Sequence, residues 1–249
     1  MDIITHTLSA VSVGTLLATY KCCNWKQKVS VIFASAIGGI VPDGDVVSLW
    51  SGFDNTFGEF FSLSSTGKEI YSDTLWYSHH GFMHSLCAIA IFTGIFALVI
   101  KCLWNDKTSL WIAWAFAAGY FTHLLGDMIT PGGPWGGIRL FFPFSVYVGG
   151  TGSIWWWNNY DIFLCTLFMA TLGVCFNFMG KNMGKKIMLP LFIIMTIAIV
   201  GLVSTKTSNF NRGNYADNEK KSNEIQKELL PSPIYNAVKT FDNHIPVLF

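Results

Sequence analysis

Long apolar stretches alternate with short polar ones along most of this 249-residue chain. A helix that crosses a membrane needs about 20 mainly apolar residues. Six stretches approach or reach that length: Ile3–Tyr20, Val29–Val41, Ser85–Trp104, Leu110–Thr130, Tyr160–Met179 and Lys186–Ser204. The pattern predicts an all-α, polytopic membrane helix bundle with about six transmembrane segments.

The second stretch, Val29–Val41, is short and contains Gly38-Gly39 just before Pro42. We expect a helix that these residues interrupt and that stops inside the bilayer or at its edge. Non-helical backbone at that depth is tolerated only where it lines protein or water. The interruption therefore favours a functional site at this end of the segment.

Two long intervals and the C-terminal end are more polar. Residues 46–78 and 131–159 are rich in aromatic residues and glycine, and Trp and Tyr favour the headgroup level of a membrane. We expect both to be outward-facing loops that cover a site, with Trp155-Trp156-Trp157 favoured as an interfacial anchor over a substrate platform. Residues 1–204 are predicted to form one membrane-embedded domain and residues 205–249 a polar tail.

Within the tail, the sequence indicates one short helix around Asn218–Leu230 and a turn at Pro231-Ser232-Pro233. His244 also lies there, and we interpret it as incidental.

The composition supports a membrane protein. The chain is 51% hydrophobic and 12% charged, whereas soluble domains average about 25% charged residues. A net charge of +1 gives no indication of nucleic-acid binding. Most of the six cysteines lie in or beside apolar stretches, where they behave as small hydrophobic residues, so no disulfide framework is predicted.

Lys and Arg predict the orientation, because they concentrate in cytoplasmic loops. The first, third and fifth connections hold Lys21, Lys26, Lys28, Lys101, Lys107, Lys181, Lys185 and Lys186. The second and fourth hold only Lys68 and Arg139. We therefore expect the two long loops to face the periplasm or exterior. Six spans would place the C-terminal tail outside as well, but its basic residues favour the cytoplasm. The side of the membrane on which the tail lies therefore stays open.

Ionisable residues gather at one end of the predicted helices. They are His6, Asp43, Asp45, His79, His80, His84, His123 and Asp127. Such groups are costly at membrane depth and usually mark a functional site. Antiparallel helices would place all of them in one layer near one membrane face, which predicts a polynuclear metal site.

The spacing supports shared ligation. His80 and His84 are four residues apart, as are His123 and Asp127, which on a helix places both side chains on one face. His79 could share an ion with His84 only if the start of that helix is irregular.

Asp43 and Asp45 alternate around Gly44, so their carboxylates could converge or bridge two ions. Imidazole with carboxylate suits two or three zinc ions, with manganese or iron as alternatives. Each motif alone also has an ordinary structural interpretation: a turn for the aspartates, a helix-packing partner for His6. Arg139 could hold a phosphate or take its position near the interface.

These motifs resemble the YdjM-type family of bacterial inner-membrane proteins, described as metal-dependent hydrolases and LexA-regulated in part. The family pattern is an N-terminal His, Pro-Asp-x-Asp, His-Arg-Gly-x-Thr-His-Ser, and Gly-Tyr-x-x-His-x-x-x-Asp-x-x-Thr-Pro-x-Gly. The matching segments cover about residues 1–145: His6, Pro42–Asp45, His79–Ser85 and Gly119–Gly133.

Two residues depart from that pattern: His80 stands in the Arg position and Met83 in the Thr position. The resemblance assigns the ligands to His79 and His84, so His80 is either a substitute cation or an additional ligand. The order of the motifs is also distantly similar to zinc-dependent phospholipase C and nuclease P1-like enzymes.

The sequence therefore favours a hydrolase in the bacterial inner membrane that acts on a lipid-embedded or lipid-linked phosphoester. The metal-bridging carboxylates Asp43 and Asp45 are the candidate catalytic residues. The alternative is a non-enzymatic protein that binds or transports metal. The last two stretches contain almost no polar residues, which disfavours transport.

Overall fold

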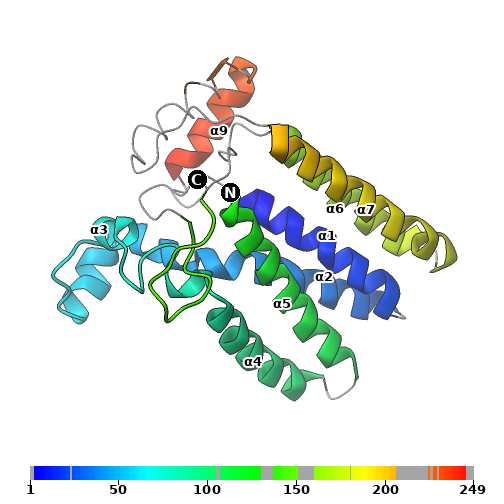
Figure 1. The fold of residues 1–249 in the computed structure, drawn as a ribbon, viewed down its shortest axis with the longest axis horizontal. Coiled ribbons are helices and arrows are strands. Elements are labelled where there is room, and N and C mark those ends of the chain that lie inside the picture. The colour runs from blue at the N-terminus through cyan, green and yellow to red at the C-terminus, as the bar shows by residue number, and fades with distance from the viewer. Residues whose placement is uncertain are drawn as a thin grey trace.

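The computed structural model describes residues 3–22, 24–104, 107–129, 137–150, 160–179, 181–205, 224, 227–228 and 230–244. Six long helices form a bundle (Figure 1): α1 (Ile3–Lys21), α2 (Trp25–Ile40), α4 (Leu86–Leu103), α5 (Lys107–Met128), α6 (Tyr160–Met179) and α7 (Lys181–Thr205). The described residues contain no β-strand, only one isolated bridge between Ile138 and Val148. The predicted all-α membrane bundle is confirmed.

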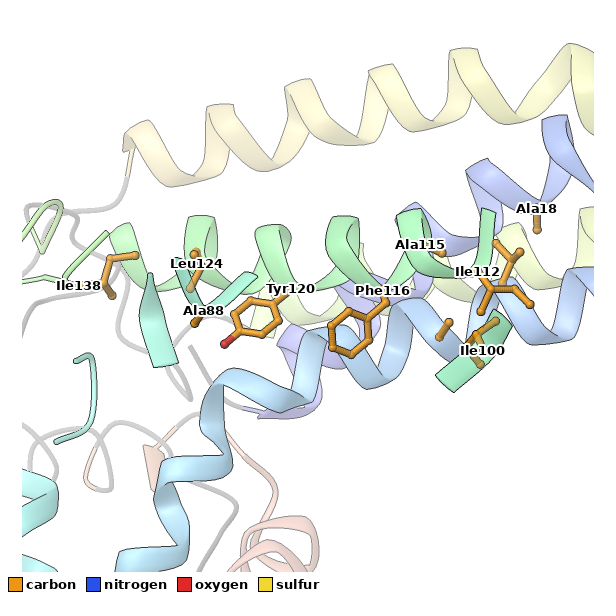
Figure 2. Packing of buried hydrophobic residues seen from close by; sticks show 11 residues of the cluster. Ala18, Ala88, Ile100, Ile112, Ala115, Phe116, Tyr120, Leu124 and Ile138 are labelled. Atoms are coloured by element: carbon orange, nitrogen blue, oxygen red, sulfur yellow. The ribbon is translucent and has the colours of Figure 1, made fainter. Parts of the chain in front are cut away.

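Helix α5 is the central helix of the bundle. It packs against α1, α2 and α4, while α6 packs against α1 and α7. Its buried side chains, among them Ile112, Phe116, Tyr120 and Leu124, form a row along the helix that neighbouring elements cover (Figure 2). The helix with this buried row also carries His123.

Five of the described helical segments are long and apolar enough to cross a membrane, and α5 is not among them. Helix α5 is 22 residues long, but it carries polar residues that the rest of the bundle buries. By contrast, α4 and α7 expose large apolar side chains such as Leu98 and Ile197. Apolar faces of this kind suit contact with lipid.

Small residues let α1, α2 and α5 approach closely. A Cβ atom added to Gly38 would lie 2.1 Å from the carbonyl oxygen of Phe116, and one added to Gly119 would lie 2.0 Å from that of Ser35. Membrane helices commonly associate through such small residues. The prediction that Gly38-Gly39 interrupt the helix is therefore wrong, because both lie within α2 and serve its packing.

Helix α2 ends at Ile40, one residue before the predicted end at Val41 and two before Pro42. The chain continues as a 3-10 helix, η1 (Val41–Leu49), which carries Asp43 and Asp45. Proline lacks the N–H that an α-helix interior needs, so it suits this change of helix type.

Residues 50–84 extend sideways from the bundle and include short helices as well as turns (Figure 1). They contain the π-helical turn η2 (Asp54–Gly58), α3 (Gly67–Ser72) and the 3-10 turn η3 (Phe82–His84). A capping box between Thr66 and Glu69 begins α3. Sequence reasoning predicted a loop here and missed these elements, which are too short to show a periodic pattern.

In the C-terminal region, Ser232–His244 form α9. The turn predicted at Pro231-Ser232-Pro233 is the start of this helix, a position that proline favours. Most of the helix predicted at Asn218–Leu230 lies outside the described residues. Helix α7 ends at Thr205, beside the predicted boundary, and the division into domains 1–204 and 205–249 stays a prediction.

Candidate metal centre

Four helix ends meet at one end of the bundle (Figure 1). They are the start of α1, the end of α2 with η1, the segment before α4, and the end of α5. These ends bring together all eight residues predicted from the sequence: His6, Asp43, Asp45, His79, His80, His84, His123 and Asp127. The predicted layer of ionisable groups is therefore present in the fold.

The centre of this layer is a group of four side chains. His123 Nε2 lies 3.3 Å from His84 Nε2, 3.4 Å from Asp43 Oδ1 and 3.0 Å from Asp127 Oδ2. His84 Nε2 lies 3.3 Å from Asp127 Oδ2 and 3.7 Å from Asp43 Oδ1. Two nitrogens and two carboxylate oxygens from three elements thus face one another.

These separations match the spacing of ligands around one ion. Zinc binds His nitrogen and carboxylate oxygen at about 2.0–2.2 Å in a tetrahedral arrangement, so two of its ligand atoms lie about 3.3–3.5 Å apart. The interatomic distances of 3.0–3.7 Å among His84, His123, Asp43 and Asp127 fall around that value. The side chains already have the spacing that ligation requires.

Backbone carbonyls fix the orientation of two histidines. His123 Nδ1 lies 2.8 Å from the carbonyl oxygen of Gly39, and His80 Nδ1 lies 2.9 Å from that of Gly137. A carbonyl only accepts, so Nδ1 of each ring carries the proton and donates it. In the neutral ring, Nε2 then keeps its lone pair for a metal, the arrangement usual for metal-binding histidines.

A second group forms around Asp45. His79 Nδ1 lies 2.9 Å from Asp45 Oδ1, and His84 Nδ1 lies 3.4 Å from Asp45 Oδ2. The ring of Tyr71 stacks on His79 with the ring centroids 4.5 Å apart. Asp43, Asp45 and His79 each offer a ligand atom within 4.8 Å of the others, so Asp43 belongs to both groups and can join them.

His6 closes the centre on the α1 side. Its Nε2 lies 3.0 Å from Asp127 Oδ1, and its ring stacks on that of His123 at a centroid distance of 3.6 Å. His6 is fully buried. The ordinary interpretation as a packing partner therefore holds in part, but the partner is another residue of the same centre.

The segment His79–His84 differs from the predicted helix. His80 has a φ of 62°, which is uncommon for a residue with a side chain, and α4 begins only at Leu86. The helical spacing proposed for His80 and His84 is therefore wrong. The irregular start allows His79, His80 and His84 to bring ligand atoms within 4.8 Å of one another.

One hydrogen bond and one close approach of the backbone determine the path of this irregular segment. The Tyr120 hydroxyl donates a hydrogen bond of 2.6 Å to the carbonyl of Met83. A Cβ atom on Gly81 would lie 2.4 Å from the carbonyl oxygen of Trp76, so only glycine fits there. Together they fix His79 to His84 against α5 and the preceding turn.

The negative charges of the aspartates in this layer favour bound protons or metal ions. Burial alone would lower the pKa of His84, but contacts with Asp127, Asp43 and Asp45 raise it well above its usual value. Burial lowers the pKa of His80 well below its usual value, which favours the neutral ring. Three carboxylates gathered at a largely buried site are stabilised by protons or by metal ions.

His6 Nδ1 is buried without a hydrogen-bond partner among the described residues, and His84 Nδ1 and Asp45 Oδ2 have only their 3.4 Å contact with each other. Buried polar atoms are nearly always satisfied, so such atoms need an explanation. Metal ions bound between the side chains would satisfy the donor set of imidazole and carboxylate. The residues present therefore fit divalent transition metal ions.

Sequence reasoning missed the groups that orient the ligands. Tyr120 had a detectable signal, because it precedes His123 by three residues and so shares a face of α5. The carbonyls of Gly39 and Gly137 had none, since a backbone acceptor leaves no trace in the residue type. Trp155-Trp156-Trp157 and the side chain of His244 lie outside the described part of the chain.

The sequence model of the YdjM inner membrane protein family matches residues 1–208. The chain belongs to this family. It is an inner membrane protein, in agreement with its apolar helices, and the match extends beyond the segments that carried the resemblance. No curated protein and no solved structure matches the chain.

Proposed function

We propose that this protein is a membrane-bound, metal-dependent hydrolase that acts on a lipid-embedded phosphoester at the outer face of the membrane. The observation that carries the proposal is that His84 Nε2 and His123 Nε2 lie 3.3 Å apart and that each lies 3.0–3.7 Å from Asp43 Oδ1 and Asp127 Oδ2. Purely structural histidine–aspartate pairs would not require two imidazole nitrogens to face each other.

Zinc is the favoured metal, in two or three ions, and manganese or iron would fit the same donors. When bound, such ions lower the pKa of a water molecule to about 7 and polarise a phosphoryl oxygen. The side chains offer overlapping groups of ligands, with Asp43 shared between two of them.

The chain's own residues would hold and orient this chemistry. Asp43 and Asp45 lie on the 3-10 helix η1, and each faces two histidines. Asp43, with a side chain 12% exposed, is the more open of the two and is the candidate to meet the substrate. No further unassigned carboxylate lies in the described centre, so we assign the general base to one of these aspartates.

The aromatic side chains beside the centre support a lipid substrate. Residues 50–77 expose Trp50, Phe60, Phe61 and Trp76 on the segment that leads into His79. Aromatic side chains of this kind favour the membrane–water interface. A phosphoester at the headgroup level would lie at the same depth as the centre.

The rival proposal is metal transport, and one observation favours it. Helix α1 buries a series of hydroxyl groups below the centre, including those of Ser12, Thr15 and Thr19. Each of them donates to a backbone carbonyl of the same helix, which satisfies it without a path for ions. The described part of α7 also exposes mainly apolar side chains. Hydrolysis remains the better-supported function.

The test is to incubate detergent-solubilised, metal-loaded protein with a membrane lipid extract and to follow the products by mass spectrometry. We expect hydrolysis of a lipid phosphoester that a chelator abolishes. Asp43→Asn and Asp45→Asn should lower the rate by at least about 100-fold, because a displaced ion no longer lowers the pKa of the attacking water.

The same preparation in proteoliposomes distinguishes the rival. Movement of zinc or manganese into the vesicles, lost in the aspartate variants and without any lipid consumed, would establish transport instead. Lys68→Gln, which changes an exposed side chain outside the set of candidate ligands, is the control for both assays.

A further inference from the structure

Arg139 is a buried cation that lies outside the metal centre. The residue is 8% exposed, and its guanidinium carbon lies 5.6 Å from the ring centroid of Phe142 and 5.9 Å from that of Tyr147. Its Nη2 reaches the carbonyl of Phe144 only at 3.5 Å. Its Nε is buried without a hydrogen-bond partner among the described residues.

Among the described residues, no carboxylate lies within ion-pair distance of this cation. Every ion pair found there joins a histidine to Asp43, Asp45 or Asp127. A buried arginine with only aromatic rings and one long contact to a carbonyl is unfavourable, because burial removes its water. An anion from outside these residues would supply that partner.

Backbone hydrogen bonds connect Arg139 to the metal centre. The Arg139 N–H donates to the carbonyl of His80 at 2.9 Å, and His80 Nδ1 donates to Gly137, two residues before Arg139. The N–H of Leu86 donates to the carbonyl of Leu140 at 3.0 Å. Residues 137–140 therefore lie directly beside the segment that carries His79, His80 and His84.

The bridge between Ile138 and Val148 joins the two ends of the segment that carries Arg139. Each of these two residues donates its N–H to the carbonyl of the other, at 3.0 and 2.8 Å. The bridge closes a loop that contains Arg139, Phe142, Phe144 and Tyr147, so the residues around the guanidinium belong to one compact unit. A preorganised cation of this kind is suited to recognition.

The net positive charge of a metal-loaded centre together with Arg139 favours an anionic ligand. Two divalent ions would exceed the three carboxylates of the centre by one positive charge, and Arg139 adds another. A guanidinium presents its N–H groups as a planar fork that matches a phosphate or carboxylate, and Arg is widely used to recognise phosphate. Neutral esters and peptides would leave the Arg139 charge uncompensated.

We infer that Arg139 binds a phosphate group of the substrate beside the metal centre. The inference rests on the proposed function and narrows its substrate class to phosphate esters. The phosphate can belong to a lipid headgroup or to a water-soluble phosphoester, and the experiment separates these sources.

The experiment measures inorganic phosphate binding to the full-length, metal-loaded protein in detergent by isothermal titration calorimetry at constant ionic strength. We expect Arg139→Gln to weaken binding at least tenfold with its metal content unchanged. Lys68→Gln removes an exposed positive charge and should bind phosphate as the wild type does. A soluble short-chain phosphatidylglycerol that displaces the phosphate would identify a lipid headgroup, and failure to displace it a water-soluble phosphoester.

Equal phosphate affinity of the wild type and a folded, metal-loaded Arg139→Gln variant would overturn the inference. If that variant does not fold, phosphate binding by Arg139→Lys is measured in its place. Lysine keeps the positive charge but lacks the planar pair of guanidinium N–H donors, so we expect phosphate binding to be several-fold weaker. An unchanged phosphate affinity would again overturn the inference. Elemental analysis and the lipid assay on the wild type test the proposed function separately, since phosphate binding that depends on Arg139 can persist without hydrolysis.

Discussion

At the scale of single residues, the acceptors of two histidine protons are the most informative contacts. The carbonyls of Gly39 and Gly137 fix Nδ1 of His123 and His80 as donors. This leaves Nε2 of each ring to face the cluster. The two hydrogen bonds therefore define which nitrogen of His123 and of His80 has a lone pair available for a metal.

The first prediction at this scale concerns metal content. His123→Ala should remove at least one equivalent of transition metal, because His123 Nε2 faces His84, Asp43 and Asp127 at once. His80→Ala should cause a partial loss of metal, since His80 belongs to one group of candidate ligands, the one with His79 and His84. Elemental analysis of the purified proteins measures both.

His244→Ala is the control for this measurement, and it should retain the wild-type metal content. Full occupancy in His123→Ala would refute the assigned centre. An unchanged metal content in His80→Ala alone would leave the centre intact and make His80 a neutral donor or acceptor toward the substrate.

How far the sequence predicted these residues depends on the kind of group. All eight ionisable residues of the centre were predicted, because charged and imidazole side chains are conspicuous among apolar helices. The orienting carbonyls were not, since any residue type supplies one. The pairing of His79 with Asp45 and of His6 with Asp127 depends on tertiary contacts between elements 34 and 121 residues apart.

At the scale of elements, the position of the centre depends on how closely α2 and α5 approach. Gly38 and Gly119 lie where the backbones of the two helices nearly touch. Gly39 lies against Ala10 of α1 and also supplies the carbonyl that orients His123. Helix packing and ligand geometry are therefore coupled.

This coupling leads to a prediction for Gly119→Ala. The added methyl group would lie 2.0 Å from the Ser35 carbonyl oxygen, so α2 and α5 must move apart. We expect a loss of stability of about 1–3 kcal/mol, the range for overpacking, together with reduced metal content. Thermal unfolding of the protein in detergent measures the first effect.

Gly94→Ala is the matched control, because a Cβ atom there meets nothing within 4 Å. In the interior of α4 alanine is the better helix former, so this variant should be as stable as the wild type or more stable. Equal stability of the Gly119 and Gly94 variants would contradict the close approach of α2 and α5.

The sequence predicted the long helices well and the short elements poorly. Runs such as Leu86–Leu103 are defined by apolar length, which a sequence displays directly. The path of His79–His84 depends instead on the left-handed residue His80, on Gly81 and on the hydrogen bond from Tyr120 to Met83. These features follow from packing around the site rather than from periodicity.

At the scale of the whole molecule, the centre and the basic connections lie at opposite ends of the bundle. The helix ends that carry Lys21, Lys101 and Lys185 are remote from the ends that meet at the centre (Figure 1). Positively charged connections favour the cytoplasm. The charge distribution thus predicts that the centre opens to the periplasmic or outer side.

The last prediction tests this orientation by cysteine labelling in a cysteine-free background. A cysteine at Asn55 or Glu59, both exposed on the segment beside the centre, should react with a membrane-impermeant maleimide in intact cells once the outer membrane is permeabilised. A cysteine at Lys26 or Lys101, exposed at the opposite end, should react only after lysis. The reverse pattern would place the centre in the cytoplasm, where its substrate would come from the inner leaflet or the cytosol.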